Sequence, residues 1–339
     1  MVKFLSLVLC VFLLLITAQA TAANEDPAYG PRLEGFTYPY PVQYFAFESQ
    51  QQSLEMAYMD VAAAPHNANG KTIVLMHGKN FCAATWEGSI SALTSAGYRV
   101  IAPDQIGFCK STKPQQYQFS FQQLAANTKA LLEKLNIANV SVMGHSMGGM
   151  LATRFALQYP NNTVALAMVN PIGLEDWKAL GVPYRSIDQW YQRALNTSAD
   201  GIRNYQRNTY YAGQWRDDFE PWVQMQAGMY RGDGREQVAW QSALTSDMIF
   251  TQPVVYEFSK LSMPVILLIG DKDNTAIGKD AAPQALRATL GNYAKLGPAA
   301  ASAIPNATLI RFADLGHSPQ IQAPERFHQA LLQALAAAK

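Results

Sequence analysis

Gly144-His145-Ser146-Met147-Gly148-Gly149 is the stretch of sequence that decides the fold class of this chain. An apolar, strand-like run at residues 140–143 precedes it, and a helix-like run at residues 147–158 follows. A serine at such a strand-to-helix turn takes a strained backbone geometry, and glycines two residues before and after it relieve the crowding. The free N–H groups of the helix N-terminus lie beside the serine. The stretch therefore predicts that Ser146 is a nucleophile.

The segments on either side alternate between strand-like and helix-like patterns. The strand-like runs are short and mostly apolar throughout, which is typical of a sheet that is covered on both faces. They are residues 72–76, 98–102, 140–143, 164–169, 265–269 and 308–312, and the helix-like stretches are residues 120–135, 147–158 and 324–338. This alternation predicts an α/β fold with a mostly parallel, doubly wound sheet. Ligands of such sheets bind at the carboxyl ends of the strands.

Two regions depart from this alternation. Residues 42–48 and 54–61 are strand-like runs around a polar loop, and they predict a hairpin. Residues 172–263 lack a strong strand signal, contain five of the six tryptophans and are too long for a loop, so we expect an inserted helical cap. The predicted division of the chain is therefore an N-terminal arm at 21–41, an α/β core at 42–171 and 264–339, and a cap at 172–263.

The overall charge of the chain is close to neutral. Its 339 residues include 26 basic and 25 acidic residues, and hydrophobic residues make up 49%. A chain this apolar is not an intrinsically disordered segment. Because there is no basic excess, we expect no nucleic-acid partner.

The first twenty residues have the pattern of a secretory signal peptide. Lys3 precedes a nearly continuous apolar run at residues 4–16, and the segment ends in Ala18-Gln19-Ala20. The run is shorter than the ~20 residues that span a bilayer, and no second run is long enough. We therefore expect a signal peptide at 1–20, cleavage near Ala20, an exported (periplasmic or secreted) protein, and no stable membrane span after cleavage.

Five motifs occur in the order found in one large superfamily. They are His77-Gly78, Asp104-Gln105-Ile106-Gly107-Phe108, Gly144-His145-Ser146-Met147-Gly148-Gly149, Gly270-Asp271-Lys272-Asp273 and Gly316-His317. With these motifs the chain resembles the α/β-hydrolase-fold superfamily, over nearly the whole sequence after the predicted signal peptide. The resemblance implies a serine hydrolase with a helical cap, similar to exported bacterial esterases and peptidases.

A seryl hydroxyl needs a base that removes its proton and a carboxylate that orients the base. Of the five histidines, His317 follows the last strand at the correct sheet end and is the predicted base. His77 and His145 belong to motifs in which histidine usually has a structural or hydrogen-bonding role. The resemblance places the acid third after Gly270, which is Asp273, with Asp271 as the alternative.

The oxyanion that forms during acyl transfer needs two preorganised donors. One is predicted to be the backbone N–H of Met147, directly after the nucleophile. The resemblance implies that the second is the backbone N–H of Lys79, with that of Asn80 as the alternative. We expect the side chain of Lys79 to be exposed to solvent.

The sequence also departs from some branches of the superfamily. Serine at position 146 argues against the haloalkane dehalogenases and epoxide hydrolases, which use a carboxylate there. The run 77–81 lacks the His-Gly-Gly-Pro-Gly sequence typical of proline iminopeptidases, which weakens the aminopeptidase alternative without excluding it. In this fold the strands before Cys82 and Cys109 are neighbours, which suggests a disulfide between these residues; two separate buried thiols are the alternative.

The sequence thus predicts hydrolysis of a carboxylic ester, or a similar acyl bond, through an acyl-enzyme on Ser146. The aromatic-rich cap suggests a small-molecule acyl substrate of apolar character. Amides, lactones and carbon–carbon bonds flanked by carbonyls remain alternatives, as does a non-catalytic ligand receptor on the same scaffold. No metal-ligand spacing or nucleotide-binding loop is evident, so we expect no cofactor and no metal. The oligomeric state is left open.

Overall fold

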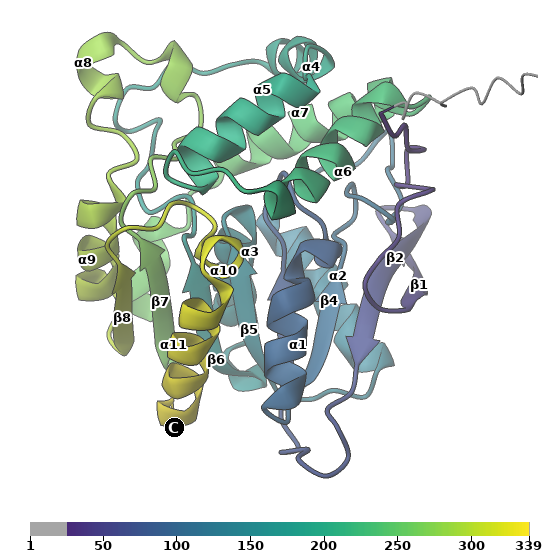
Figure 1. Ribbon diagram of the computed structural model, residues 1–339, viewed down its shortest axis with the longest axis vertical. Coiled ribbons are helices and arrows are strands. Elements are labelled where there is room, and N and C mark those ends of the chain that lie inside the picture. Colours follow the sequence, from purple (N-terminus) through teal and green to yellow (C-terminus); the bar gives the residue numbers. More distant parts are fainter. Residues whose placement is uncertain (1–25, 339) are drawn as a thin grey trace, which may run out of the picture.

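The computed structural model describes residues 26–338, so the predicted signal peptide and the start of the predicted arm lie outside the described residues. A central sheet of eight strands runs through the molecule (Figure 1). Its order is β1-β2-β4-β3-β5-β6-β7-β8. The strands are β1 (Val42–Ser49), β2 (Gln52–Val61), β3 (Thr72–Met76), β4 (Arg99–Pro103), β5 (Val140–His145), β6 (Thr163–Val169), β7 (Val265–Gly270) and β8 (Ala307–Phe312).

The pairing of the strands confirms the predicted sheet. β1 and β2 form the expected hairpin, in register from Val42 opposite Met59 to Ser49 opposite Gln52. β2 also pairs antiparallel with β4, whereas all the other neighbours are parallel. The carboxyl ends of the parallel strands therefore lie along one edge of the sheet, where this fold class places its ligands.

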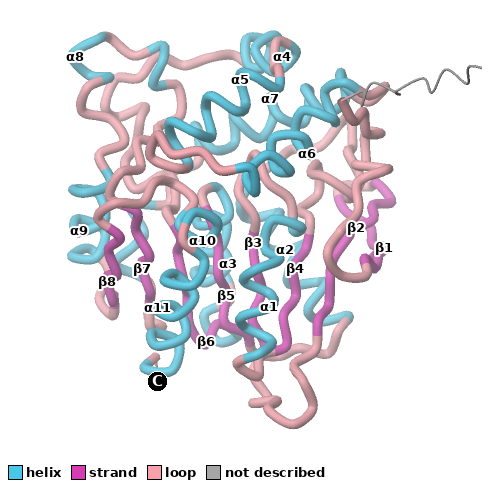
Figure 2. The backbone as a smooth tube through the Cα atoms, viewed as in Figure 1, coloured by secondary structure: helices cyan, strands magenta, loops and turns pink. Residues whose placement is uncertain are grey.

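Helices cover both faces of the sheet (Figures 1 and 2). Along β3, Val74 and Met76 belong to one buried cluster and Ile73 and Leu75 to another, so consecutive residues of the strand are buried on opposite faces. This explains the absence of polar–apolar alternation in the sequence. The helices of the sandwich are α1 (Glu87–Ser95) and α11 (Pro324–Ala337) on one face, and α2 (Phe121–Lys134), α3 (Met147–Gln158) and α9 (Tyr293–Ala303) on the other.

The segment predicted as a cap is helical and lies across the carboxyl ends of the strands (Figure 1). Its helices are α4 (Ile187–Leu195), α5 (Ala199–Tyr205), α6 (Glu220–Arg231) and α7 (Arg235–Thr251), and a π-helical turn (Gln206–Tyr210) follows α5. The short helices α8 (Gln284–Arg287) and α10 (Pro319–Gln322) lie outside this segment. Among the described residues, no helix has the length and apolar character needed to cross a bilayer.

The N-terminal arm joins the α6 helix to the sheet. The backbone N–H of Tyr29 donates to the carbonyl of Gly228 at 2.9 Å, and any Cβ at Gly228 would overlap the Tyr29 ring. Further along the arm, the Tyr38 hydroxyl donates to Asp104 Oδ2 at 2.6 Å. The described part of the arm therefore contacts both the cap segment and the turn after β4, a packing role that its sequence did not reveal.

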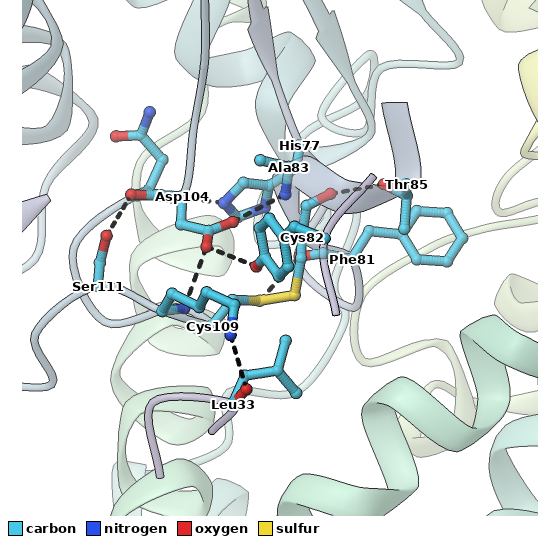
Figure 3. Close-up of a disulfide and its surroundings, with 12 residues drawn as sticks. Leu33, His77, Phe81, Cys82, Ala83, Thr85, Asp104, Cys109 and Ser111 are labelled. Atoms are coloured by element: carbon cyan, nitrogen blue, oxygen red, sulfur yellow. Dashed lines mark hydrogen bonds between the residues drawn. A yellow bond between two sulfur atoms is a disulfide. The ribbon is translucent and has the colours of Figure 1, made fainter. Parts of the chain in front are cut away.

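Cys82 and Cys109 form the disulfide that the sequence suggested (Figure 3). Their Cα atoms are 5.9 Å apart, and the bond joins the turns that follow the neighbouring strands β3 and β4. Beside it, the buried carboxylate of Asp104 accepts hydrogen bonds from Ala83 N, Tyr38 Oη and Lys110 N. Because the two sulfur atoms are bonded to each other, this group of residues has no thiolate with which to bind a metal.

The disulfide is expected to stabilise the fold strongly. It closes a loop across a sequence separation of 27 residues, for which the chain-entropy estimate is about 3.5 kcal/mol. The double variant Cys82→Ala/Cys109→Ala should lose about that much free energy of unfolding in urea titrations. Wild-type protein that is fully reduced and alkylated should lose a similar amount. A loss below about 1 kcal/mol in both samples would show that the bond does not brace the two turns.

Candidate active site

Ser146 stands at the sharp turn between β5 and α3. Its backbone angles are φ 57° and ψ −121°, a strained conformation for a residue other than glycine. A Cβ at Gly144 would overlap the carbonyl of Gly148, and a Cβ at Gly148 would overlap the carbonyl of Met76. The glycines predicted from the sequence are therefore required by close backbone contacts. The Ser146 side chain lies at the carboxyl end of β5 and is almost fully buried.

This close packing gives a prediction for Gly148→Ala. The new methyl group would meet backbone atoms of β3, which cannot move aside cheaply, so the free energy of unfolding should fall by about 2–3 kcal/mol. Gly88→Ala is a matched control, because a Cβ there would make only an ordinary 3.5 Å contact with His328. Urea unfolding of both variants measures the difference. Equal stabilities would argue against the tight turn.

His317 and Asp273 form a buried pair. Nδ1 of His317 is 2.6 Å from Oδ2 of Asp273, and both side chains are shielded from solvent. Oδ1 of Asp273 accepts from the backbone N–H and the hydroxyl of Thr275, at 2.8 and 2.7 Å. These contacts fix the carboxylate against the imidazole. Asp271, the alternative acid, forms an ion pair with Arg311 at 2.8 Å instead.

Asn170 is a positioning residue that the sequence analysis did not assign. Its Nδ2 donates to Asp273 Oδ2 at 2.9 Å, and its Oδ1 accepts from the backbone N–H of Gly270 at 2.8 Å. The amide thus ties the end of β6 to the end of β7 and holds the carboxylate. The available signal was its place directly after an apolar strand, where the other polar residues of the site also lie.

Ser146 and His317, whose hydrogen bond would complete the expected triad, are not hydrogen-bonded to each other in this structure. Nε2 of His317 is buried and has no hydrogen-bond partner among the described residues. Ser146 lies at the same edge of the sheet as His317. Its neighbour His145 contacts His317 directly, because Nε2 of His145 lies 2.8 Å from the carbonyl oxygen of His317. Catalytic hydrogen bonds are often long or unmade without substrate. The unpartnered Nε2 leaves the imidazole with a free position for a proton.

His145 and His77 make the hydrogen bonds expected of structural histidines. Since a carbonyl oxygen can only accept, His145 donates from Nε2 to His317, and burial holds the pKa of His145 well below its usual value. His77 lies 2.8 Å from the Gly78 carbonyl through Nδ1, and its Nε2 accepts from Gln105 N at 3.0 Å. Burial also lowers the pKa of His77. Both rings therefore hold the loops of the site together through hydrogen bonds.

Two sets of backbone donors lie near Ser146. Met147 is the first residue of α3, and its N–H has no acceptor in the described part of the chain. The loop after β3 approaches from the other side, since a Cβ at Gly78 would lie 3.1 Å from Cβ of Ser146. The N–H groups of Lys79 and Asn80 likewise have no acceptor among residues 26–338. Both candidates for the second oxyanion donor therefore remain available.

The cap segment contacts this site directly. The carbonyls of Thr209 and Tyr210 in the π-helical turn accept from the backbone N–H groups of His317 and Ser318, both at 3.1 Å. The Tyr210 ring lies against the His317 imidazole with centroids 5.0 Å apart, and its hydroxyl accepts from Asn80 Nδ2 at 2.9 Å. Short π-helical segments are frequent at functional sites. Here the turn covers the histidine and excludes water from it.

The expectation that the Lys79 side chain is exposed was wrong. Its Nζ donates to Ser242 Oγ in α7 at 2.7 Å, so the side chain is largely enclosed beneath the cap segment. Burial, with a smaller contribution from the Arg193 guanidinium, lowers the pKa of Lys79 to about 8. This contact could not be predicted from the sequence, because Lys79 and Ser242 are 163 residues apart.

Comparison with known proteins agrees with this geometry. Residues 71–324 match the family model described as the alpha/beta hydrolase fold. The chain belongs to the α/β-hydrolase-fold family. The match covers most of the chain, from β3 to the start of α11, and includes the stretches that carry Ser146, Asp273 and His317.

One solved structure is especially similar to this α/β-hydrolase-fold protein. A probable hydrolytic enzyme from Pseudomonas aeruginosa PAO1 is 71% identical, with a TM-score of 0.90, and the match covers 91% of this chain and 99% of that one. A putative carbamate hydrolase from Pantoea ananatis is 28% identical over 47% of this chain and 56% of its own length. A haloalkane dehalogenase from Mycolicibacterium paratuberculosis is 30% identical over 39% of this chain and 44% of its own length. The chain thus spans about half the length of these two curated relatives.

Proposed function

We propose that this protein is a serine hydrolase that cleaves a carboxylic ester through an acyl-enzyme on Ser146. The observation that carries the proposal is the buried His317–Asp273 pair, whose free Nε2 lies at the sheet edge that also presents Ser146. A base that is oriented by a carboxylate and placed beside a seryl hydroxyl is the arrangement that activates serine.

In the proposed mechanism, Ser146 Oγ attacks the carbonyl carbon of the ester while its proton passes to Nε2 of His317. Asp273 holds Nδ1 and stabilises the imidazolium. The carbonyl oxygen becomes an oxyanion, which accepts from Met147 N–H and from a second N–H in the loop of Lys79 and Asn80. When the tetrahedral intermediate collapses, the alkoxide leaves with the proton from His317, and water then releases the acid by the same steps.

Ester cleavage is preferred to halide displacement and to amide hydrolysis. The nucleophile is a hydroxyl, so displacement of a halide through a carboxylate nucleophile, the chemistry that the sequence analysis attributed to dehalogenases, has no equivalent at this position. Amides and lactones fit the same constellation and are the alternatives within the proposal. The alkoxide of an ester is a better leaving group than the amine of an amide, so an ester needs less protonation of its leaving group by His317.

A panel of 4-nitrophenyl esters, anilides and lactones tests the proposal. We expect ester turnover that a fluorophosphonate abolishes with a stoichiometry of one per chain, and the labelled peptide should contain Ser146. Turnover that persists in fully labelled protein would contradict the nucleophile assignment. Ligand binding without any turnover across the panel would support a receptor instead.

We also propose that the protein acts outside the cytoplasm. The Cys82–Cys109 disulfide supports export, because such bonds persist in oxidising compartments and are rare in the cytosol. The signal-peptide pattern at 1–20 gives independent support from the sequence. Expression with this segment should yield a mature protein that begins after Ala20 in the exported fraction. Retention of residues 1–20 in a cytoplasmic protein would contradict the proposal.

A further inference from the structure

A small cavity lies between the loop after β3 and the cap segment. Its volume is about 40 Å³, which corresponds to about three water-sized groups. Its apolar lining comes mainly from Phe81, Phe108, Met229 and Val238, and two of its lining residues are Lys79 and Lys113. Cys109 also lines it, so the disulfide drawn in Figure 3 braces one of its walls. No carboxylate lines this cavity in the described structure.

Lys113 is buried without a counterion. The residue is 5% exposed, and its Nζ donates to the carbonyl of Cys109 at 2.6 Å. An ammonium group has three donors, and no carboxylate among residues 26–338 forms an ion pair with it. Burying such a charge is costly, and burial lowers the pKa of Lys113 to about 7.

Two carboxylates, those of Asp104 and Glu34, attract Lys113 from a distance, but neither forms an ion pair with it. The two oxygens of Asp104 accept from Ala83, Tyr38 and Lys110. Lys79, on the opposite loop, likewise contacts a hydroxyl and no carboxylate. The cavity thus presents two enclosed lysine side chains, neither of which forms an ion pair with a carboxylate among the described residues, and a bound anion would favour their charged forms. Enclosed cations with free donors are suited to binding an anion.

The cavity is connected to the candidate active site through a single loop. Gly78 contacts Ser146, and the next three residues, Lys79 to Phe81, line the cavity. None of Ser146, Asp273 and His317 lines the cavity, so a substrate whose carbonyl is bound at Ser146 would have to extend past this loop to reach it beneath α6 and α7. The cavity has room for little more than a carboxylate, so most of a hydrocarbon spacer would lie outside it, and the lysines suit the charged group at the end of that spacer.

We propose that this cavity binds a carboxylate of the substrate, so that the preferred substrates are esters whose acyl chain carries a terminal carboxylate. The inference rests on the proposed serine hydrolase function and specifies the substrate class of the same site. Lys113 supplies the charge in this arrangement, and Lys79 supplies a second ammonium group from the loop nearest Ser146. The sequence predicts an acyl substrate of apolar character, and the proposal adds a charged group at the end of its acyl chain.

The test compares 4-nitrophenyl monoesters of adipic and suberic acid with the neutral hexanoate and octanoate esters. These chains are long enough that the free carboxylate does not readily attack its own ester. We expect wild-type kcat/KM to favour the anionic ester by at least tenfold at one chain length. A ratio near one or below at both lengths would overturn the inference.

The Lys113→Met variant identifies the cavity as the source of this preference. Its ratio of kcat/KM for anionic over neutral ester should fall at least tenfold, while Lys113→Arg should retain part of the preference. Lys110→Met is the matched control: this lysine is on the same turn, but it donates to Leu33 O and does not line the cavity. Its ratio should change less than twofold. An unchanged ratio in Lys113→Met would overturn the assignment.

Each ratio compares two substrates within one protein, so a general loss of activity cancels. If Lys113→Met fails to fold, the same measurement on Lys79→Met decides, with the same expected fall. Calorimetric titration of Ser146→Ala with adipate separates the two proposals. Adipate binding to Ser146→Ala, together with no ester turnover by the wild type, would leave the cavity assignment standing and remove the esterase. Ser146-dependent turnover without anionic preference or adipate binding would remove the cavity assignment alone.

Discussion

Replacement of Ser146 by alanine is expected to lower kcat for ester hydrolysis by about 10⁴- to 10⁶-fold. The substitution removes the atom that forms the acyl bond, and binding with oxyanion stabilisation accounts for the small residual rate. The fold should be retained, because the Ser146 hydroxyl has no hydrogen-bond partner within the described residues and alanine fits the same backbone. Steady-state kinetics and a thermal melt of the same sample give both quantities.

The neighbouring Ser318→Ala variant is the matched control for this prediction. Ser318 is fully buried beside His317, and its hydroxyl has no partner in the part of the chain that the structure describes. Its loss should change kcat less than tenfold. If Ser146→Ala kept more than a hundredth of wild-type kcat, or if Ser318→Ala were equally damaging, Ser146 would not be the nucleophile.

Asp273→Asn should lower kcat by about 10⁴-fold. In the wild type, Oδ2 of Asp273 accepts from His317 Nδ1 and Asn170 Nδ2. If the NH₂ group of the asparagine takes the place of Oδ2, it cannot accept from either donor. Turning the amide instead places the NH₂ against the two donors of Thr275. Either orientation disturbs the imidazole, and the favoured tautomer would carry its proton on Nε2. His317 could then no longer accept the proton of Ser146.

Asp271→Asn makes the same change from carboxylate to amide at the alternative acid, two residues before Asp273. Asp271 pairs with Arg311, which is partly exposed, so its replacement should change kcat less than about threefold and cost about 1 kcal/mol of stability or less. The comparison decides between the two acids that the sequence left open. A large loss of kcat in Asp271→Asn with a small one in Asp273→Asn would reverse the assignment of the acid.

Features with a local signal were predictable from the sequence. The Ser146 turn depends on glycines within two residues of it. The helix predicted at 120–135 begins with a cap in which Ser120 Oγ accepts from Gln123 N. The strands of the sheet show as apolar runs because both faces of the sheet are covered. The Cys82–Cys109 pair followed from the strand order of the family.

Contacts between distant segments were not predictable. The role of Asn170 depends on a carboxylate 103 residues away, and the burial of Lys79 on a serine of α7. The packing of Tyr29 on α6 requires the exact approach of two backbones, which no periodicity encodes. A lysine in a polar stretch of sequence is expected to be exposed. The burial of Lys113 could therefore not be predicted, because it depends on contacts with the cap segment.

The most direct measurement of the central claim is the site of the acyl group during turnover. Protein that is quenched in acid while it hydrolyses 4-nitrophenyl hexanoate can be digested and its peptides mapped by mass spectrometry. We expect a single hexanoyl group on the peptide that contains Ser146, located on that serine by fragmentation. An acyl group on any other residue during steady ester turnover would contradict the account.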